Sequence, residues 1–388
     1  MNAKDAAREQ FDSRRERLIA LSRRIHAHPE LGFEEENAVA WLGDELAGTG
    51  FDVQRGIAGM PTAFSARAGS GPLHVAFCAE YDALPGIGHA CGHNLIAAST
   101  LGAAFAAAKV ADEVGLTVTV LGTPAEENGG GKVLLLRNGA FRGVHAAMMV
   151  HPAPLDLAEP PTLAWSQFDI HYTGKEAHAS AFPELGVNAA DAITVAQTAI
   201  GLLRQHLGSG DRVHGIVTCG GAAPNVVPAH TAARYMVRAR TSGELEEVRG
   251  KVLRCFEAGA VATGAKLEIR PTCEDYAEVR HDRDIALLYR KNAEALGRFF
   301  PDPGVRFERA AGSTDMGNVS QALPAIHPTI GIASAPAVNH QPEFAAHCVK
   351  PAAEQALVDG AVALAWTAID LALDAGQRSR LLENSSWK

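Results

Sequence analysis

Cysteine, histidine and acidic residues of the kinds that bind metal ions gather in short stretches of this 388-residue sequence. Cys91 and His93 stand two positions apart in the stretch HACGH, residues 89–93. In a turn, both side chains can face the same side and bind one or two cations. The same spacing also fits a tight turn with a buried thiol, so the pair alone leaves both interpretations open. His89 is interpreted as structural, because a third ligand from so tight a loop would be sterically awkward.

Further potential ligands follow the apolar runs that predict strands. They are Asp82 after residues 73–79, Glu126 and Glu127 after 116–121, His151 after 146–150, and His340 beyond 325–332. Ligands bind beyond the carboxyl ends of parallel strands, so we expect these residues to converge on one crevice. Thiolate, imidazole and carboxylate together suit zinc, with cobalt, nickel and manganese as alternatives.

The adjacent pair Glu126 and Glu127 indicates two different roles. Successive side chains of an extended segment face opposite ways, so one carboxylate can bind metal while the other acts as a general base. Metal-assisted hydrolysis requires both, since the cation lowers the pKa of water and a carboxylate removes the proton. An acidic loop in water is the alternative. Asp82 either orients a ligand imidazole or caps a turn.

The order of predicted elements indicates two domains. Residues 5–48 predict helices, and the apolar runs that follow alternate with helix-compatible sequence. This pattern is typical of an α/β layer with a mixed, largely parallel sheet and helices on both faces. A β-α-β-β-α-β order predicts an inserted α+β domain of ferredoxin-like type at residues 163–274. The metal-binding domain would then comprise residues 1–162 and 275–388.

Composition and charge exclude several classes of partner. The formal net charge is -9, and no cluster of Lys and Arg with interleaved aromatic residues is present, which argues against nucleic acid. The glycine run 129–131 lacks the lysine-ended spacing of a phosphate loop, which argues against nucleotide binding. We expect no membrane association, and the six scattered cysteines fit reduced thiols in a cytoplasmic protein.

An ordered series of motifs resembles the M20 metallopeptidases, and within them the D subfamily of amidohydrolases. The motifs are RRIHAHPELGFEE, AEYDALPGIGHACGHN, GTPAEENGGGK, MMVHP, GKEAHAS, APNVVP, GSTDMGNVS and NHQPEF. The resemblance covers nearly the whole chain. Many members of the subfamily have aspartate where this chain has Glu80 and methionine where it has Tyr81, which places the chain nearer the dipeptidase-like branch.

The resemblance implies a zinc-exopeptidase-like fold, a site for two divalent metal ions, and a role for each matching residue. Cys91 would bridge the two ions, with His93, Glu127, His151 and His340 as further ligands, Glu126 as the general base and Asp82 as the orienting residue. His178 would stabilise the developing oxyanion from the partner subunit of a homodimer, Asn225 would contact substrate, and Arg240 would bind a substrate carboxylate. The inserted domain would serve as lid and dimer surface.

We therefore expect a metal-dependent amidohydrolase or peptidase that acts on a small amide. Dipeptides, N-acyl amino acids and aryl-amino acid conjugates are the expected substrate classes. Two alternatives stay open at this point. Cys91 could be a nucleophile in a metal-independent amidase, with His93 as its base, or the chain could be a non-catalytic binding protein on the same fold.

Overall fold

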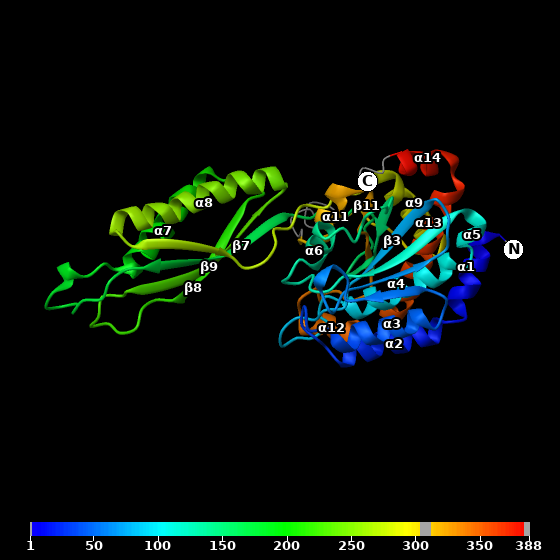
Figure 1. Cartoon of the computed structure of the whole chain (residues 1–388), viewed down its shortest axis with the longest axis horizontal. Coiled ribbons are helices and arrows are strands. Elements are labelled where there is room, and N and C mark those ends of the chain that lie inside the picture. The colour runs from blue at the N-terminus through cyan, green and yellow to red at the C-terminus, as the bar shows by residue number, and fades with distance from the viewer. Residues whose placement is uncertain (1, 303–311, 384–388) are drawn as a thin grey trace. The chain divides into compact units, whose positions relative to one another are not determined.

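The chain divides into two compact units (Figure 1), here in a computed structural model that describes residues 2–302 and 312–383. The main unit comprises Met1–Pro161 with Val279–Lys388, and the inserted unit comprises Thr162–Glu278. The inserted unit begins one residue before and ends four residues after the predicted insertion of 163–274.

A six-stranded sheet forms the centre of the main unit. Its strands, in spatial order, are β1 (Asp52–Arg55), β2 (Phe64–Ala68), β4 (Leu116–Gly122), β3 (Leu73–Ala79), β5 (Ala146–Met148) and β11 (Ala325–Ile326). Strands β4, β3, β5 and β11 run parallel, whereas β1 and β2 pair antiparallel at one edge. The predicted mixed, largely parallel sheet is confirmed, with its antiparallel pairing at the edge formed by β1 and β2.

The apolar run 325–332 was expected to form a single strand, and the structure divides it in two. Strand β11 ends at Ile326, and β12 (Thr329–Gly331) pairs parallel with β6 (His151–Ala153) in a separate two-stranded sheet. Between them lies Pro328, whose nitrogen has no hydrogen to donate to a ladder. Its carbonyl instead accepts a hydrogen bond from the backbone N–H of His151 at 2.9 Å.

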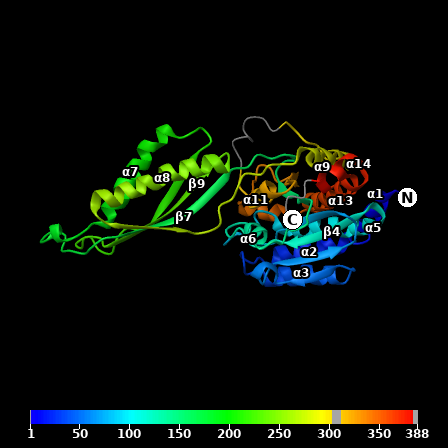
Figure 2. The same ribbon diagram turned by 45° about the horizontal axis from the view of Figure 1, so that its top comes forward.

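Helices cover both faces of the main sheet (Figure 2). They are α1 (Ala3–Asp12), α2 (Arg15–Ala27), α3 (Glu36–Ala47), α4 (His93–Ala108), α5 (Ala111–Val114), α6 (Gly131–Arg137), α9 (Arg283–Ala295), α11 (Met316–Ala322), α12 (Pro342–His347), α13 (Pro351–Leu373) and α14 (Ala375–Glu383). Side chains of β3 alternate: Val75 and Phe77 join the cluster with α4 and α13, whereas Ala76 and Cys78 join the one with α6 and α11. Burial on both faces explains why β3 is continuously apolar.

Helix α13 lies in the core of the main unit. It is the one helix in the described part of the chain that is long and apolar enough to cross a membrane, but 83% of its apolar window is buried within the protein. The same helix contacts α4, α9 and α1. Its apolar composition is therefore accounted for by packing against these neighbours.

The inserted unit is an antiparallel sheet with two helices on one face. Its elements, in chain order, are β7 (Ala164–Thr173), α7 (Ala189–Leu203), β8 (Arg212–Cys219), β9 (His230–Ala239), α8 (Ser242–Thr263) and β10 (Lys266–Pro271). The spatial order is β10-β7-β9-β8, with every neighbouring pair antiparallel. Inward-facing Phe168, Ile170 and Tyr172 of β7 pack with apolar residues of both helices. The predicted ferredoxin-like arrangement is confirmed.

Candidate metal centre

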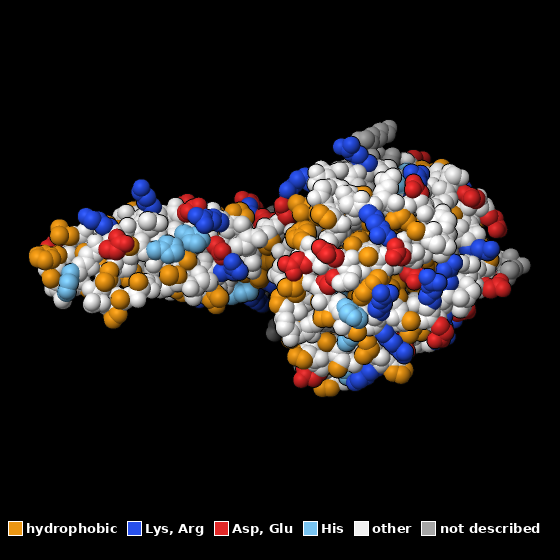
Figure 3. Space-filling model, turned by 60° about the horizontal axis from the view of Figure 1, so that its bottom comes forward, with side chains coloured by type: hydrophobic (Ala, Val, Ile, Leu, Met, Phe, Trp, Pro, Cys, Tyr) orange, Lys and Arg blue, Asp and Glu red, His pale blue; other side chains and the backbone are white. Residues whose placement is uncertain are grey.

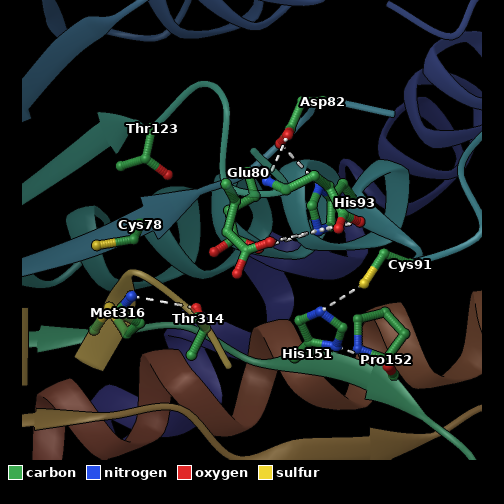
Figure 4. A network of polar contacts seen from close by, with 12 residues as sticks. Cys78, Glu80, Asp82, Cys91, His93, Thr123, His151, Pro152, Thr314 and Met316 are labelled. Carbon is green, nitrogen blue, oxygen red and sulfur yellow. Dashed lines mark hydrogen bonds and ion pairs between the residues drawn. The ribbon is translucent and has the colours of Figure 1, made fainter. Parts of the chain in front are cut away.

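The predicted ligands of the main unit come together where loops leave the carboxyl ends of its parallel strands, and Figure 4 shows three of them, Cys91, His93 and His151. Cys91 ends the loop after β3, and His93 is the first residue of α4. Gly92 stands between them with φ 83°, a left-handed conformation that glycine adopts without strain. A Cβ atom at that position would lie 2.9 Å from the ring of Pro152, so the turn also needs a residue without a side chain.

The thiol of Cys91 lies between two groups of potential ligands. Its Sγ atom is 3.4 Å from Nε2 of His151 and 3.6 Å from Nε2 of His340. Nε2 of His340 is in turn 3.4 Å from a carboxylate oxygen of Glu127. The described residues thus offer one cluster of Cys91, His93 and His151 and another of Cys91, Glu127 and His340, and the two clusters share the sulfur atom.

These separations fit metal coordination. Tetrahedral zinc with Zn–N and Zn–O distances near 2.0–2.1 Å and Zn–S near 2.3 Å places neighbouring ligand atoms about 3.3 to 3.6 Å apart. The three contacts around Cys91 and His340 measure 3.4, 3.6 and 3.4 Å. Nε2 of His93 and Oε1 of Glu127 are buried and have no hydrogen-bond partner within residues 2–302 and 312–383. The donor set and its spacing therefore suit two cations that share one thiolate.

Asp82 orients the imidazole of one candidate ligand and the loop that carries another. It accepts a hydrogen bond from Nδ1–H of His93 at 3.0 Å through one oxygen, and one from the backbone N–H of Glu127 at 3.0 Å through the other. His151 is fixed similarly, because its Nδ1–H donates to the carbonyl of Pro152 at 2.8 Å. Both imidazoles consequently turn Nε2 toward the site, which is the orientation that metal binding requires.

Burial of many acidic groups shapes the electrostatics of the site. Burial raises the pKa of Cys91 well above its usual value, and the Glu127 carboxylate raises it further. Burial and the neighbouring Glu80 likewise raise the pKa of Glu126. Burial by itself would lower the pKa of His93, but Asp82 and Cys91 together more than offset it and hold that pKa well above its usual value. In the absence of cations, the site therefore retains protons.

The loop that carries Glu126 and Glu127 is held by the segment before α3. Ala125 has φ 57°, and its backbone N–H donates to a carboxylate oxygen of the buried Glu35 at 2.8 Å. Burial and nearby Asp82 raise the pKa of Glu35 to about 7. Gly32 allows the close approach, since a Cβ there would lie 2.8 Å from that of Ala125. The sequence suggested no such role for Glu35, because the contact joins residues 90 positions apart.

A buried ion cluster behind the ligands was also not foreseen. The ammonium group of Lys132 donates to Glu80 at 2.5 Å and to Asp315 at 2.6 Å, and all three side chains are fully buried. Lys132 stands at the start of α6, directly after the loop of Glu126, and Asp315 directly precedes α11. The only sequence signal was the position of each residue inside a motif of the resemblance.

The predicted residues of the inserted unit fall into two places. His178 and Asn225 lie on adjacent segments, because the carbonyl of Asn225 accepts a hydrogen bond from Ala179 N–H at 3.0 Å and Val226 forms a β-bridge with His178. Arg240 follows the opposite end of β9, a ten-residue strand of about 33 Å, and donates to Ser209 at 2.8 Å. The structure therefore groups His178 with Asn225 but not with Arg240.

Comparisons with known proteins identify the family of the chain. The profile of peptidase family M20/M25/M40 matches residues 76–365. The Xaa-Arg dipeptidase of Mus musculus is 40% identical over 95% of this chain and 88% of its own length, and a p-aminobenzoyl-glutamate hydrolase chain of Escherichia coli (strain K12) is 34% identical over 69% and 60%. A putative aminohydrolase from methicillin resistant Staphylococcus aureus has the same fold, with a TM-score of 0.77, 21% identity and coverage of 95% and 99%. On these grounds the chain belongs to peptidase family M20/M25/M40.

Proposed function

We propose that this protein is a metal-dependent dipeptidase that hydrolyses the amide bond of a small substrate. The observation that carries the proposal is the shared thiolate position: Cys91 Sγ lies 3.4 Å from His151 and 3.6 Å from His340, with Glu126 beside the ligand Glu127. When bound, two divalent cations would lower the pKa of a water molecule and polarise the substrate carbonyl.

Glu126 acts as the general base in this proposal. Its carboxylate lies 3.9 Å from Nε2 of His93, and burial with neighbouring Glu80 raises its pKa well above that of a free glutamate. A raised pKa makes the carboxylate a stronger base, and it allows the same group to return the proton to the leaving amine. Glu127 is committed to the other role, because its carboxylate faces His340 at 3.4 Å.

The metal-independent alternative, with Cys91 as nucleophile, lacks physical support. Only the thiolate is nucleophilic, and nearby cationic groups are what normally stabilise it. Here burial and then the Glu127 carboxylate raise the pKa of the Cys91 thiol well above its usual value. The thiol would therefore stay protonated at neutral pH unless a cation bound to it.

Zinc is the cation that we propose for the site. Each cluster combines the Cys91 thiolate with imidazole, and zinc accepts thiolate, imidazole and carboxylate in tetrahedral geometry. Manganese prefers an oxygen-rich site, whereas cobalt and nickel bind the same donors as zinc. Metal analysis of the purified protein by mass spectrometry tests this choice.

Dipeptides with a C-terminal basic residue are the substrates that we propose first. Xaa-Arg dipeptidases of Mus musculus and Homo sapiens are 40% and 38% identical over 95% and 94% of this chain, which supports that class over N-acyl amino acids and aryl-glutamate conjugates. A screen of all three classes with zinc-loaded protein tests the proposal. Faster hydrolysis of acyl amino acids or aryl conjugates than of any dipeptide would contradict it.

The general base is tested by the variant Glu126→Gln. We expect it to bind two zinc ions and to lose at least about 100-fold in kcat, since general bases contribute about 10²–10⁴-fold. Removing metal with a chelator should abolish wild-type activity, and adding zinc should restore it. Full activity after verified metal removal would refute the proposed mechanism.

We propose that the protein works as a cytoplasmic homodimer whose inserted unit serves both as a lid and as the dimer surface. Nδ1 of His178 accepts hydrogen bonds from the N–H groups of Ser180 and Ala181, at 3.3 and 3.2 Å, which leaves Nε2–H as a donor for an oxyanion. Strand β8 is an edge strand with Ile216 and Val217 exposed, and Figure 3 shows hydrophobic side chains among charged ones on the same unit. All six cysteines are free, which supports the cytoplasmic location.

Mixing two inactive variants tests whether His178 acts across the dimer. A dimer of one His178→Ala chain and one Glu126→Gln chain holds one site with both functional residues only if each site takes its histidine from the partner. After random subunit exchange, activity should recover to about a quarter of wild type, because half of the dimers are mixed and each has one complete site of two. If each chain supplied its own histidine, no mixture would regain activity.

A further inference from the structure

Glu80 presents an oxygen atom to the metal centre that the five predicted ligands do not account for. Its Oε2 lies 3.4 Å from Nε2 of His93, nearer than the carboxylate oxygens of Glu126 and Glu127, which both lie 3.9 Å from the same nitrogen. Glu80 and His93 are both fully buried. In the described part of the chain, neither of the two facing atoms has a hydrogen-bond partner.

The two facing atoms are both acceptors once metal is bound. Nδ1–H of His93 donates to Asp82 at 3.0 Å, so a ligating His93 carries its lone pair on Nε2. A lone pair and a carboxylate oxygen repel each other in a buried site unless a positive charge lies between them. Their separation of 3.4 Å is close to the distance between neighbouring nitrogen and oxygen ligands on a tetrahedral zinc ion, about 3.3 Å.

The other half of the Glu80 carboxylate is fixed by the buried ion cluster. Oε1 accepts a hydrogen bond from Nζ of Lys132 at 2.5 Å, and Lys132 is held from its other side by Asp315 through both Nζ and the backbone N–H, at 2.6 and 2.8 Å. Lys132 therefore balances part of the charge of Glu80 and fixes the orientation in which Oε2 faces His93. Glu80, His93 and Glu126 form the third group of described residues whose ligand atoms lie within 4.8 Å of one another.

We propose that Glu80 is a sixth metal ligand, which binds through Oε2 the cation held by His93, and that Lys132 and Asp315 position it. This inference rests on the proposed function, because it presupposes the two cations. It makes the two cations unequal: the one at His93 gains the Glu80 carboxylate and its negative charge, whereas the one at His340 keeps three protein ligands and an open position. The cation at His93 should therefore bind more tightly, and the open one should be the site of the reaction.

A crystal structure of the zinc-loaded wild-type protein tests the ligand directly. We expect Oε2 of Glu80 to lie about 2.0–2.2 Å from one zinc ion. A distance above about 3 Å in a protein that holds both zinc ions would overturn this inference and leave the proposed function intact. Failure to bind zinc at all would instead contradict the proposed function.

Metal titration of two variants gives a second measurement. Against a competing chelator, wild-type protein should release its two zinc ions in two steps, and Glu80→Gln should weaken the tighter step at least about 10-fold, because the amide carries no charge. The control Asp315→Asn also takes a negative charge from Lys132 but leaves Oε2 of Glu80 facing His93, so the tighter step should weaken less than in Glu80→Gln. Equal zinc affinities of Glu80→Gln and wild type, or equal losses in both variants, would overturn the role of Glu80 as a ligand.

Discussion

Replacing Asp82 by asparagine should weaken metal binding more than replacing it by alanine. Asp82 accepts two hydrogen bonds of 3.0 Å, one from Nδ1–H of His93 and one from the backbone N–H of Glu127. An asparagine can accept only one of them, and its NH2 group must face the other donor or donate to His93. Donation to Nδ1 would shift the imidazole proton to Nε2, where it blocks the lone pair that binds metal.

The expected loss follows from the number of contacts. Partners of ligand residues typically contribute 10- to 100-fold in metal affinity, so a loss of about 1.4–2.7 kcal/mol is expected for one contact. Asp82→Asn affects two candidate ligands and imposes the wrong tautomer on His93. Its loss of metal affinity should therefore reach the upper end of this range. Asp82→Ala leaves His93 free to adopt either tautomer and should lie at the lower end.

The assay is a zinc competition titration of the metal-free variants with a fluorescent chelator, with thermal unfolding measured in parallel. Asp156→Asn is the matched control: Asp156 is also a buried acceptor, and it receives hydrogen bonds from Arg298 and from the N–H of Gly331 at 2.7 and 2.8 Å. The control should lower stability without changing zinc affinity. Wild-type zinc affinity in Asp82→Asn, or a smaller loss than in Asp82→Ala, would refute the tautomer argument.

Three further perturbations test the site and its frame. Cys91→Ser should lower zinc affinity in both clusters and shift the preference toward manganese, measured by metal analysis, because oxygen is the harder ligand. Gly92→Ala should lower the free energy of unfolding by about 1–3 kcal/mol through strain at φ 83° and also weaken zinc binding, whereas Gly59→Ala at φ 76°, with no atom within 4 Å, should show the strain alone. Burial lowers the pKa of His74 to about 4, so the unfolded chain binds its proton first, and metal-free protein should lose up to about 3 kcal/mol as pH falls from about 6.5 to 4. In His74→Gln, acid unfolding should be shallower over that range, and an unchanged slope would contradict this source of the pH dependence.

The convergence of the main-unit ligands could be predicted because it depends on local rules. The runs 73–79 and 116–121 form buried parallel strands, and the residues directly after such strands lie at the same edge of the sheet. The order of these strands in the chain therefore predicts that Glu127 and Cys91 lie close together, even when no packing contact is known. His151 joins them by the same rule, since it begins β6 shortly after the carboxyl end of β5.

The supporting residues could not be predicted in this way, because their partners are set by packing. Lys132 and Asp315 are 183 positions apart, and a fully buried lysine is unusual enough that the sequence favours a solvated side chain at this position. The contact between Glu35 and Ala125 likewise joins two loops that no periodicity relates. The substrate-binding role expected for Arg240 stays a prediction, and the structure places this residue at the end of β9 away from Asn225.

The supporting residues also explain why so many acidic groups can crowd one buried site. Burial raises the pKa of Cys91 and Glu127, while Asp82, against the effect of burial, raises the pKa of His93, so all three favour the protonated form before metal binds. The metal-free fold is thereby spared most of the cost of buried negative charge. Metal binding must then displace these protons, and apparent affinity rises roughly tenfold per pH unit for each proton released. The same acceptors that would destabilise an empty site thus make its metal affinity depend steeply on pH, and the buried Lys132 offsets part of the negative charge of Glu80.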